Sequence, residues 1–167
     1  MDDLIGFLRE RLDEDELWAV EASRRGDGPV AEGGVHWRWE DPATDQPVKV
    51  NPGEDEFVGG DSFRVSLRSR EEWPTASGLG SLPQFAIPEA EEVPSAVGGH
   101  IARHDPSRVL AEVEAKRGIL EAHGGDLPEQ PMFCGHCEHD TPCPTLRFLA
   151  APYSSHPDYR PEWAPAA

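Results

Sequence analysis

All three cysteines of this 167-residue chain lie in one stretch, His123-Gly-Gly-Asp-Leu-Pro-Glu-Gln-Pro-Met-Phe-Cys134-Gly-His-Cys137-Glu-His-Asp-Thr-Pro-Cys143. The Cys-x-x-Cys spacing of Cys134 and Cys137 lets two sulfurs converge on one ion while backbone amides hydrogen-bond to them. Cys143 precedes Pro144 at an expected helix start, where the positive end of the helix dipole favours a thiolate. In a reducing cytosol, such clustered cysteines indicate metal ligands before disulfides. We therefore predict a structural zinc site at Cys134, Cys137 and Cys143.

A structural zinc site needs a fourth ligand. We expect it to be His123, because this residue ends a predicted helix and the following glycines and prolines let the chain turn back. His139 is nearer in sequence, but only one residue separates it from Cys137. His104 and His156 would reach the site only through tertiary folding. A helix-terminal imidazole that bonds the last carbonyls is the alternative role for His123, and free thiols or a redox pair are the alternatives for the cysteines.

The charge balance limits the classes of partner. The chain has 15 Lys and Arg against 32 Asp and Glu, a formal net charge of -17, which repels phosphate backbones and anionic membrane surfaces. We expect a protein partner, no direct nucleic-acid binding and no membrane association. No window approaches the ~18 apolar residues of a membrane span, and the N-terminus lacks a signal-peptide pattern, so we expect a cytoplasmic protein.

The hydrophobic pattern predicts one α+β domain over residues 1–167 with a lean core. Apolar residues at three- and four-residue steps predict an N-terminal helix over 1–24. Alternating side chains at 35–40 and 63–68 predict strands of a small antiparallel sheet in the region 35–87, and residues 88–94 are expected to form an extended acidic connector. Residues 95–167 are predicted to form a helical region that contains the cysteine cluster.

Three helices are expected in that second region. The first covers 95–104, the second 106–122 and the third 144–151. Asp105 is expected to be the N-cap of the second helix with Pro106 at its first position, and Gly124 with Gly125 to end it. The aromatic tail, with Tyr159 and Trp163, is expected to lie against the body of the protein.

Two further motifs resemble those of a known family. His-Ile-Ala-Arg-His-Asp-Pro-Ser-Arg-Val-Leu-Ala-Glu-Val-Glu-Ala-Lys-Arg covers 100–117, and Leu-Arg-Phe-Leu-Ala-Ala-Pro-Tyr at 146–153 precedes His-Pro-Asp-Tyr-Arg at 156–160. They resemble the signatures of a family of uncharacterised proteins, a domain of unknown function, from actinobacteria and their phages. The similarity extends through 66–75, 85–87 and 91–99. The resemblance implies an actinobacterial or phage source, and it transfers no activity and no catalytic residue.

Three functional hypotheses follow. The first is a small acidic zinc-binding protein with a non-enzymatic interaction or accessory role. The second is an acidic inhibitor that mimics nucleic acid toward a basic host protein. The third is a metal-dependent hydrolase that uses His100, His104 and Asp105, since two histidines one helical turn apart can share a metal. The sequence contains no Gly-rich phosphate loop, no Gly-x-Ser-x-Gly and no dinucleotide fingerprint, which favours a non-enzymatic role.

Overall fold

The computed structural model describes residues 2–24, 29–41, 44, 46–47, 64–83, 85–91, 95–124, 126–127 and 130–166. The chain divides into two compact units, one formed by Met1–Leu17 with Ala111–Ala167 and the other by Trp18–Leu110. A single domain over residues 1–167 therefore stays a prediction. Within the described residues, no helix is both long enough and apolar enough to cross a membrane.

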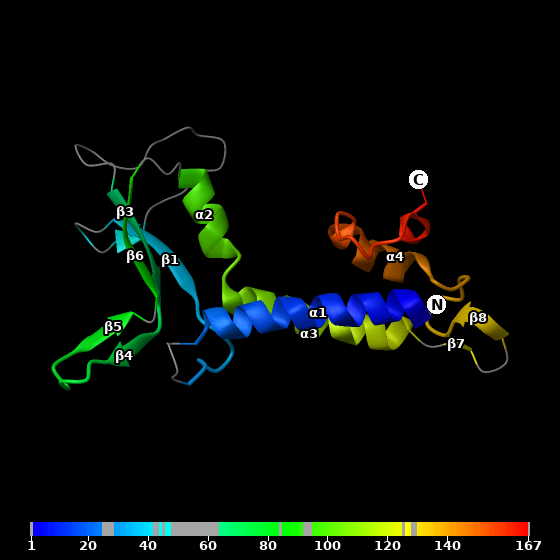
Figure 1. The fold of residues 1–167 in the computed structure, drawn as a ribbon, viewed down its shortest axis with the longest axis horizontal. Coiled ribbons are helices and arrows are strands. Elements are labelled where there is room, and N and C mark those ends of the chain that lie inside the picture. Colours follow the sequence, from blue (N-terminus) through cyan, green and yellow to red (C-terminus); the bar gives the residue numbers. More distant parts are fainter. Residues whose placement is uncertain are drawn as a thin grey trace. The chain divides into compact units, whose positions relative to one another are not determined.

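The described elements confirm the α+β class (Figure 1). The helices are α1 (Asp2–Ala22), α2 (Ser95–Arg103), α3 (Pro106–His123) and α4 (Pro144–Ala150), with short 3-10 turns at Ala151–Tyr153 and Pro161–Trp163. The strands are β1 (Trp37–Asp41), β2 (Gln46–Pro47), β3 (Arg64–Ser69), β4 (Glu72–Pro74), β5 (Ser81–Pro83), β6 (Ala86–Glu91), β7 (Asp126–Leu127) and β8 (Gln130–Cys134). The predicted N-terminal helix and the three later helices are therefore present.

The unit Trp18–Leu110 is built on a four-stranded antiparallel sheet of order β2-β1-β3-β6. A separate two-stranded ribbon, β4 with β5, pairs Trp73 with Leu82. The predicted strand over 63–68 is confirmed from Arg64 onward, whereas Phe63 lies outside the described residues. The sheet thus has the predicted small size and antiparallel order.

One local prediction is wrong. Residues 88–91 of the acidic connector expected at 88–94 form strand, because β6 runs to Glu91 and pairs with β3, with Val65 opposite Ala90. Residues 92–94 lie outside the described residues. Cross-strand pairing outweighs the Pro- and Glu-rich composition of this segment. The predicted helical region 95–167 contains the three expected helices, and β7 and β8 form a hairpin within it.

Asp105 starts α3 as predicted. Its Oδ1 accepts the amide of Arg108 at 2.8 Å, which is the N-cap bond. Its Oδ2 accepts the amide of Trp37 at 3.3 Å, and the residue is only 8% exposed. One carboxylate therefore caps a helix and holds the start of β1.

Helix α2 packs closely on β1. A Cβ built at Gly98 would overlap the indole ring of Trp39, so only glycine lets the helix approach this side chain. Trp39 itself is 6% exposed. The alternation that predicted a buried face containing Trp39 is confirmed at this residue.

A buried carboxylate lies in the same sheet. Glu40 of β1 is fully buried and forms ion pairs with Arg38 at 2.8 Å and with Arg68 of β3 at 3.2 Å. Arg38 and Arg68 are register partners across the two strands, so both arginines approach Glu40 from one face of the sheet. The face of β1 that carries Arg38 and Glu40 is polar in sequence, but it is therefore not fully exposed to solvent.

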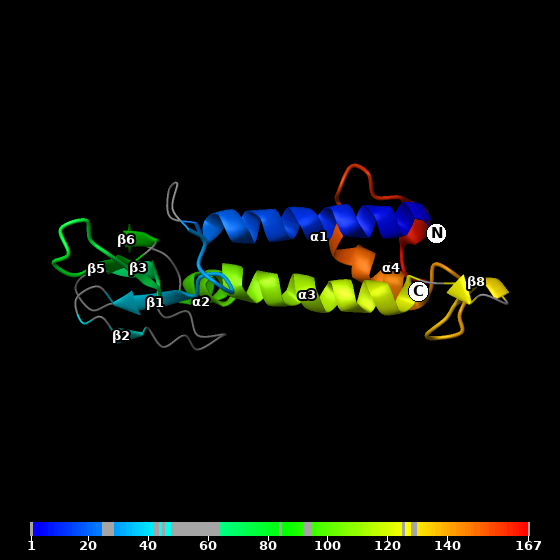
Figure 2. The ribbon, with the colours of Figure 1, turned by 90° about the horizontal axis from the view of Figure 1, so that it is seen from below.

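The core of the other unit consists of side chains from its helices and from the folded-back tail. Figure 2 shows the ribbons of α1, α3 and α4 that carry them. The buried apolar side chains are Leu4, Ile5, Phe7, Leu8, Leu12, Val113, Leu120, Leu146, Ala150 and Trp163. The ring of Phe7 lies 5.0 Å from Trp163 and 6.1 Å from Tyr159 between centroids. Arg160 pairs with Asp3 at 2.7 Å. The expectation that the aromatic tail lies against the body is confirmed.

Candidate metal centre

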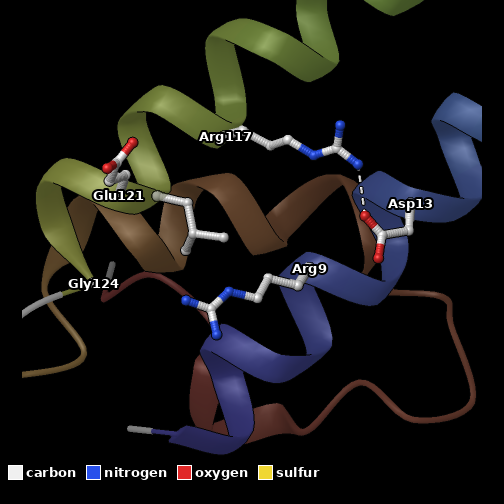
Figure 3. Close-up of a pocket in the computed structure, with 6 residues that line it drawn as sticks. Arg9, Asp13, Arg117, Glu121 and Gly124 are labelled. Atoms are coloured by element: carbon white, nitrogen blue, oxygen red, sulfur yellow. Dashed lines mark hydrogen bonds and ion pairs between the residues drawn. The ribbon is translucent and has the colours of Figure 1, made fainter.

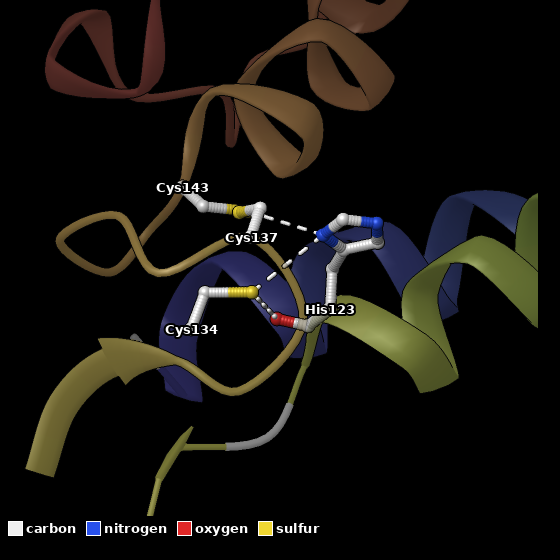
Figure 4. Close-up of side chains that lie close together, drawn as sticks. All are labelled: His123, Cys134, Cys137 and Cys143. Atoms are coloured by element: carbon white, nitrogen blue, oxygen red, sulfur yellow. Dashed lines mark hydrogen bonds between the residues drawn. The ribbon is translucent and has the colours of Figure 1, made fainter. Parts of the chain in front are cut away.

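Three elements of one unit bring the predicted site residues together. His123 is the last residue of α3, Cys134 ends β8, Cys137 lies in the turn that follows, and Cys143 directly precedes α4. Figure 4 shows the four side chains pointing toward a common centre. Their ligand atoms all lie within 4.8 Å of one another, so this cluster could hold a metal ion.

The distances suit a tetrahedral ion. Bond lengths of about 2.3 Å to sulfur and about 2.05 Å to nitrogen place tetrahedral ligands about 3.8 Å apart for two sulfurs and about 3.6 Å apart for sulfur and nitrogen. The Nδ1 atom of His123 lies 3.6 Å from the sulfur of Cys134 and 3.7 Å from that of Cys143. Two edges of the cluster therefore already have the length that a shared zinc-sized ion requires.

Burial supports the same interpretation. Cys134 and Cys143 are fully buried and Cys137 is half-buried, so the centre is largely shielded from solvent. All four positions of a tetrahedral ion would be filled by protein atoms. A closed site of three sulfurs and one imidazole is typical of structural zinc rather than of a catalytic metal, which keeps an open position.

Backbone hydrogen bonds shape the turn around Cys134. The amide of Glu138 donates to the carbonyl of Cys134 at 3.0 Å, and the amide of Cys134 donates to the carbonyl of His139 at 2.8 Å. Glu138 has a positive φ of 55°, the left-handed conformation that closes such a turn. The loop is thus folded by its own backbone into a shape that presents both sulfurs.

The surroundings shift the thiol and imidazole pKa values in different directions. Burial opposes ionisation of Cys134, but hydrogen bonds from the amides of His136 and Cys137 and from the other two thiols lower its pKa below the ordinary value. Burial, together with the neighbouring cysteines, raises the pKa of Cys137 to about 11. Burial, then the nearby His136, lowers the pKa of His123, which favours the neutral imidazole that a metal needs.

The other histidines lie elsewhere. The Nδ1 of His139 is 2.7 Å from the carbonyl of Cys137 and the residue is exposed, so it is not a member of the cluster. His156 contacts Arg11 and the ring of Phe7. His104 packs on His100 in the Trp18–Leu110 unit. Of the four histidines weighed from the sequence, only His123 joins the cysteines.

His136 has a role that the sequence did not indicate. Its ring packs edge-on against that of His123, with centroids 4.5 Å apart. This contact restrains the orientation of the His123 ring at the cluster. The one sequence signal for this contact is the position of His136 between Cys134 and Cys137, directly before Cys137.

A groove lies beside α1 and α3 in the unit formed by Met1–Leu17 with Ala111–Ala167, which contains the cysteine cluster and is named the cluster unit. It has a volume of about 610 Å³ and is lined by Arg9, Asp13, Arg117, Leu120, Glu121 and Gly124 (Figure 3). Arg117 donates to Asp13 at 2.6 Å and to Glu16 at 2.8 Å, which raises its pKa further above its usual range. Arg117 thus joins α3 to α1 through two ion pairs. The sequence alone does not indicate this role.

The comparisons with known proteins identify the family. A family of unknown function, DUF6221, matches residues 1–165. The chain belongs to this family. No curated protein and no solved structure matches it. This family is of unknown function, as is the family that the sequence motifs resemble.

Proposed function

We propose that His123, Cys134, Cys137 and Cys143 bind one structural zinc ion, and that the protein is a zinc-stapled, non-enzymatic interaction protein. The observation that carries this proposal is the approach of four ligand atoms to within 4.8 Å from three different elements. An ion at their centre would join the end of α3, the β7–β8 hairpin and the start of α4. In a chain of lean core, such a bond supplies stability that apolar burial does not.

Zinc suits this ligand set better than other metals. Thiolates and imidazole are the ligands that zinc prefers, and zinc accepts tetrahedral geometry without loss of ligand-field energy. Calcium and magnesium prefer oxygen ligands, and no carboxylate belongs to this group within the described residues. We therefore assign zinc in preference to an oxygen-loving cation.

Metal analysis of untagged protein, prepared without chelators, tests the site. We expect about one zinc per chain, and loss of most of it in His123→Ala and in Cys143→Ser. His139→Ala is the matched control, since this exposed histidine lies in the same loop and outside the cluster. It should retain the full zinc content.

Cobalt replacement keeps the test decisive if a cysteine variant does not fold. Co(II) bound to three sulfurs and one nitrogen in tetrahedral geometry gives strong visible absorption and thiolate charge-transfer bands. Zinc content near zero, together with cobalt spectra typical of octahedral oxygen ligands, would show that the cluster is not a metal site.

An interaction role is supported by an exposed tryptophan of the Trp18–Leu110 unit. Trp18 is 71% exposed, although tryptophan usually buries its ring or uses it at an interface. A net charge of -17 on the chain favours a partner surface that is basic around an apolar centre. We therefore propose a partner contact at Trp18, in an accessory protein of actinobacterial or phage origin that works in the cytoplasm.

A salt series on captured partners tests this contact. A basic protein should be retained by the wild-type chain, lost with Trp18→Ala and released by salt. Leu79→Ala is the control, because Leu79 is 88% exposed in the loop between β4 and β5. Partner capture that is unchanged by Trp18→Ala and by added salt would overturn the proposed contact.

The same experiment separates the accessory role from the inhibitor role. The charge of -17 is the observation that favours an acidic inhibitor. Such an inhibitor occupies the nucleic-acid surface of its target, so duplex DNA should displace it competitively. An accessory protein bound elsewhere should remain on the partner when DNA is added.

A further inference from the structure

A second group of metal-binding side chains lies in the Trp18–Leu110 unit. His100 of α2 and His104 directly after it are one helical turn apart, and the amide of His104 donates to the carbonyl of His100 at 3.2 Å. Their rings lie 4.4 Å apart between centroids, with an angle of 47° between the ring planes. Both residues are exposed. Two imidazoles at this spacing on a helical turn can bind one metal ion.

The ring separation allows both imidazoles to reach one ion. A metal lies about 2.05 Å from a ligating ring nitrogen. Rings 4.4 Å apart between centroids are close enough for one nitrogen of each ring to bind the same ion.

Two imidazoles without a thiolate favour particular metals. Imidazole suits Cu(II) and Ni(II), and it binds both more tightly than the earlier divalent metals. The pair therefore differs in preference from the cysteine cluster, which is suited to zinc.

Asp105 does not complete a hydrolytic site here. Both of its carboxylate oxygens accept backbone amides, those of Arg108 and Trp37. No group of three or more metal-ligating side chains includes this pair among the described residues. A metal on the pair would retain most of its coordination positions for water or for donor atoms of another molecule.

We propose that His100 and His104 form a two-imidazole site for Ni(II) or Cu(II), distinct from the zinc cluster. The site is independent of the proposed zinc function, because its residues lie in the other compact unit. It binds the metal at the end of α2 and presents open coordination positions outward. The ligand that occupies those positions is an oxygen or nitrogen donor.

Calorimetric titration of zinc-loaded protein with Ni(II) at mildly alkaline pH tests the proposal. Zinc-loading keeps the thiols occupied, and Ni(II) avoids the thiol oxidation that Cu(II) causes. We expect one Ni(II) per chain, with affinity at least about tenfold weaker in His100→Ala or His104→Ala, because a single imidazole loses the chelate advantage. His139→Ala, an exposed histidine outside the pair, should bind Ni(II) as the wild type does.

A relocated histidine separates chelation from histidine count. The double variant Ala102→His with His104→Ala keeps two histidines but places them two residues apart, on different faces of the helix. It should bind Ni(II) as weakly as His104→Ala. Selective broadening of the His100 and His104 ring signals by Ni(II) in NMR spectra is the second readout. Equal affinity in all variants, or broadening spread over the other histidines, would overturn the site.

Discussion

The two compact units bury polar atoms in different ways. In the Trp18–Leu110 unit, the fully buried Glu40 has its counter-charges in the chain itself, at Arg38 and Arg68. In the other unit, Cys134 and Cys143 are equally buried and face His123, which supplies no fixed opposite charge. The charge of Glu40 is balanced by side chains of the same chain, whereas the cysteine cluster could hold a metal ion from solution.

This difference predicts which unit needs metal from solution for its stability and which unit needs only its own charged side chains. Ion pairs within a chain form whenever the chain folds, and their strength varies with salt and pH. A metal centre adds its binding free energy to folding only when metal is available. The cluster unit should therefore respond to chelators, and the sheet unit should respond to substitution of its charged residues.

Metal removal is expected to have the largest effect. Apparent binding free energies of structural zinc reach about 10–16 kcal/mol in small peptides, so a chelator should strip the cluster unit of much of its stability. Hydrogen exchange should lose protection around β8 and α4 while β1 and β3 stay protected. Equal loss in both units would show that they fold as one, and no loss would contradict a structural metal.

Replacement of the buried carboxylate comes next. Glu40→Ala removes the buried carboxylate that pairs with Arg38 and Arg68, and it should cost about 3 kcal/mol of unfolding free energy, the low end for buried pairs because both arginines are partly exposed. Glu32→Ala, an exposed carboxylate of the same unit, is the control and should change stability little. Denaturant unfolding measures both. A stable Glu40→Ala protein would show that the ion pairs do not hold the sheet.

The cap of α3 should have a smaller effect. Asp105→Ala removes the N-cap bond and the bond to the Trp37 amide, and we expect a loss of about 1–2 kcal/mol. Asp105→Asn keeps one acceptor oxygen and should lose about half of that amount. Thermal unfolding followed by circular dichroism measures the two variants. An equal loss in both would indicate that charge, rather than the hydrogen bonds, matters at this position.

The smallest effect concerns a surface pair of the sheet unit. Burial opposes ionisation of Glu71, but the ring and amide of His36 bond its carboxylate and hold its pKa below the ordinary value. A lowered folded-state pKa gives stability that is present above the unfolded pKa and is lost as pH falls through the folded pKa. His36→Ala should raise the Glu71 pKa only partly, since the amide remains. Carboxyl NMR titration measures it, with Glu72 as the internal reference.

The elements with strong local signals could be predicted from sequence. The apolar steps of α1, the Asp105-Pro106 start of α3 and the alternation of β1 are properties of neighbouring residues. The part of β6 beyond Ile87 could not be predicted, because its Pro88-Glu89-Ala90-Glu91 sequence favours an extended linker and only pairing with β3 makes it a strand. The burial of Glu40 similarly depends on an arginine from another strand.

The candidate site was largely predictable because its chemistry is concentrated in sequence. Three cysteines within ten positions, together with a histidine at a helix end, left few ways to bring four ligands together. The packing of His136 on His123 could not be inferred, because it depends on how the turn folds back over α3. The close approach of the His100 and His104 rings likewise required coordinates.

The cluster unit joins the two ends of the chain, and this has a consequence for its synthesis. Asp3 pairs with Arg160, 157 positions later, and Phe7 packs on Trp163. At about 5–20 residues per second, the ribosome needs roughly 10 to 30 s to supply those partners. Throughout this interval the apolar stripe of α1 is without its partners from the C-terminal half. We therefore expect newly made chains to expose Leu4, Phe7 and Leu8 until the tail is made, which favours aggregation during this interval.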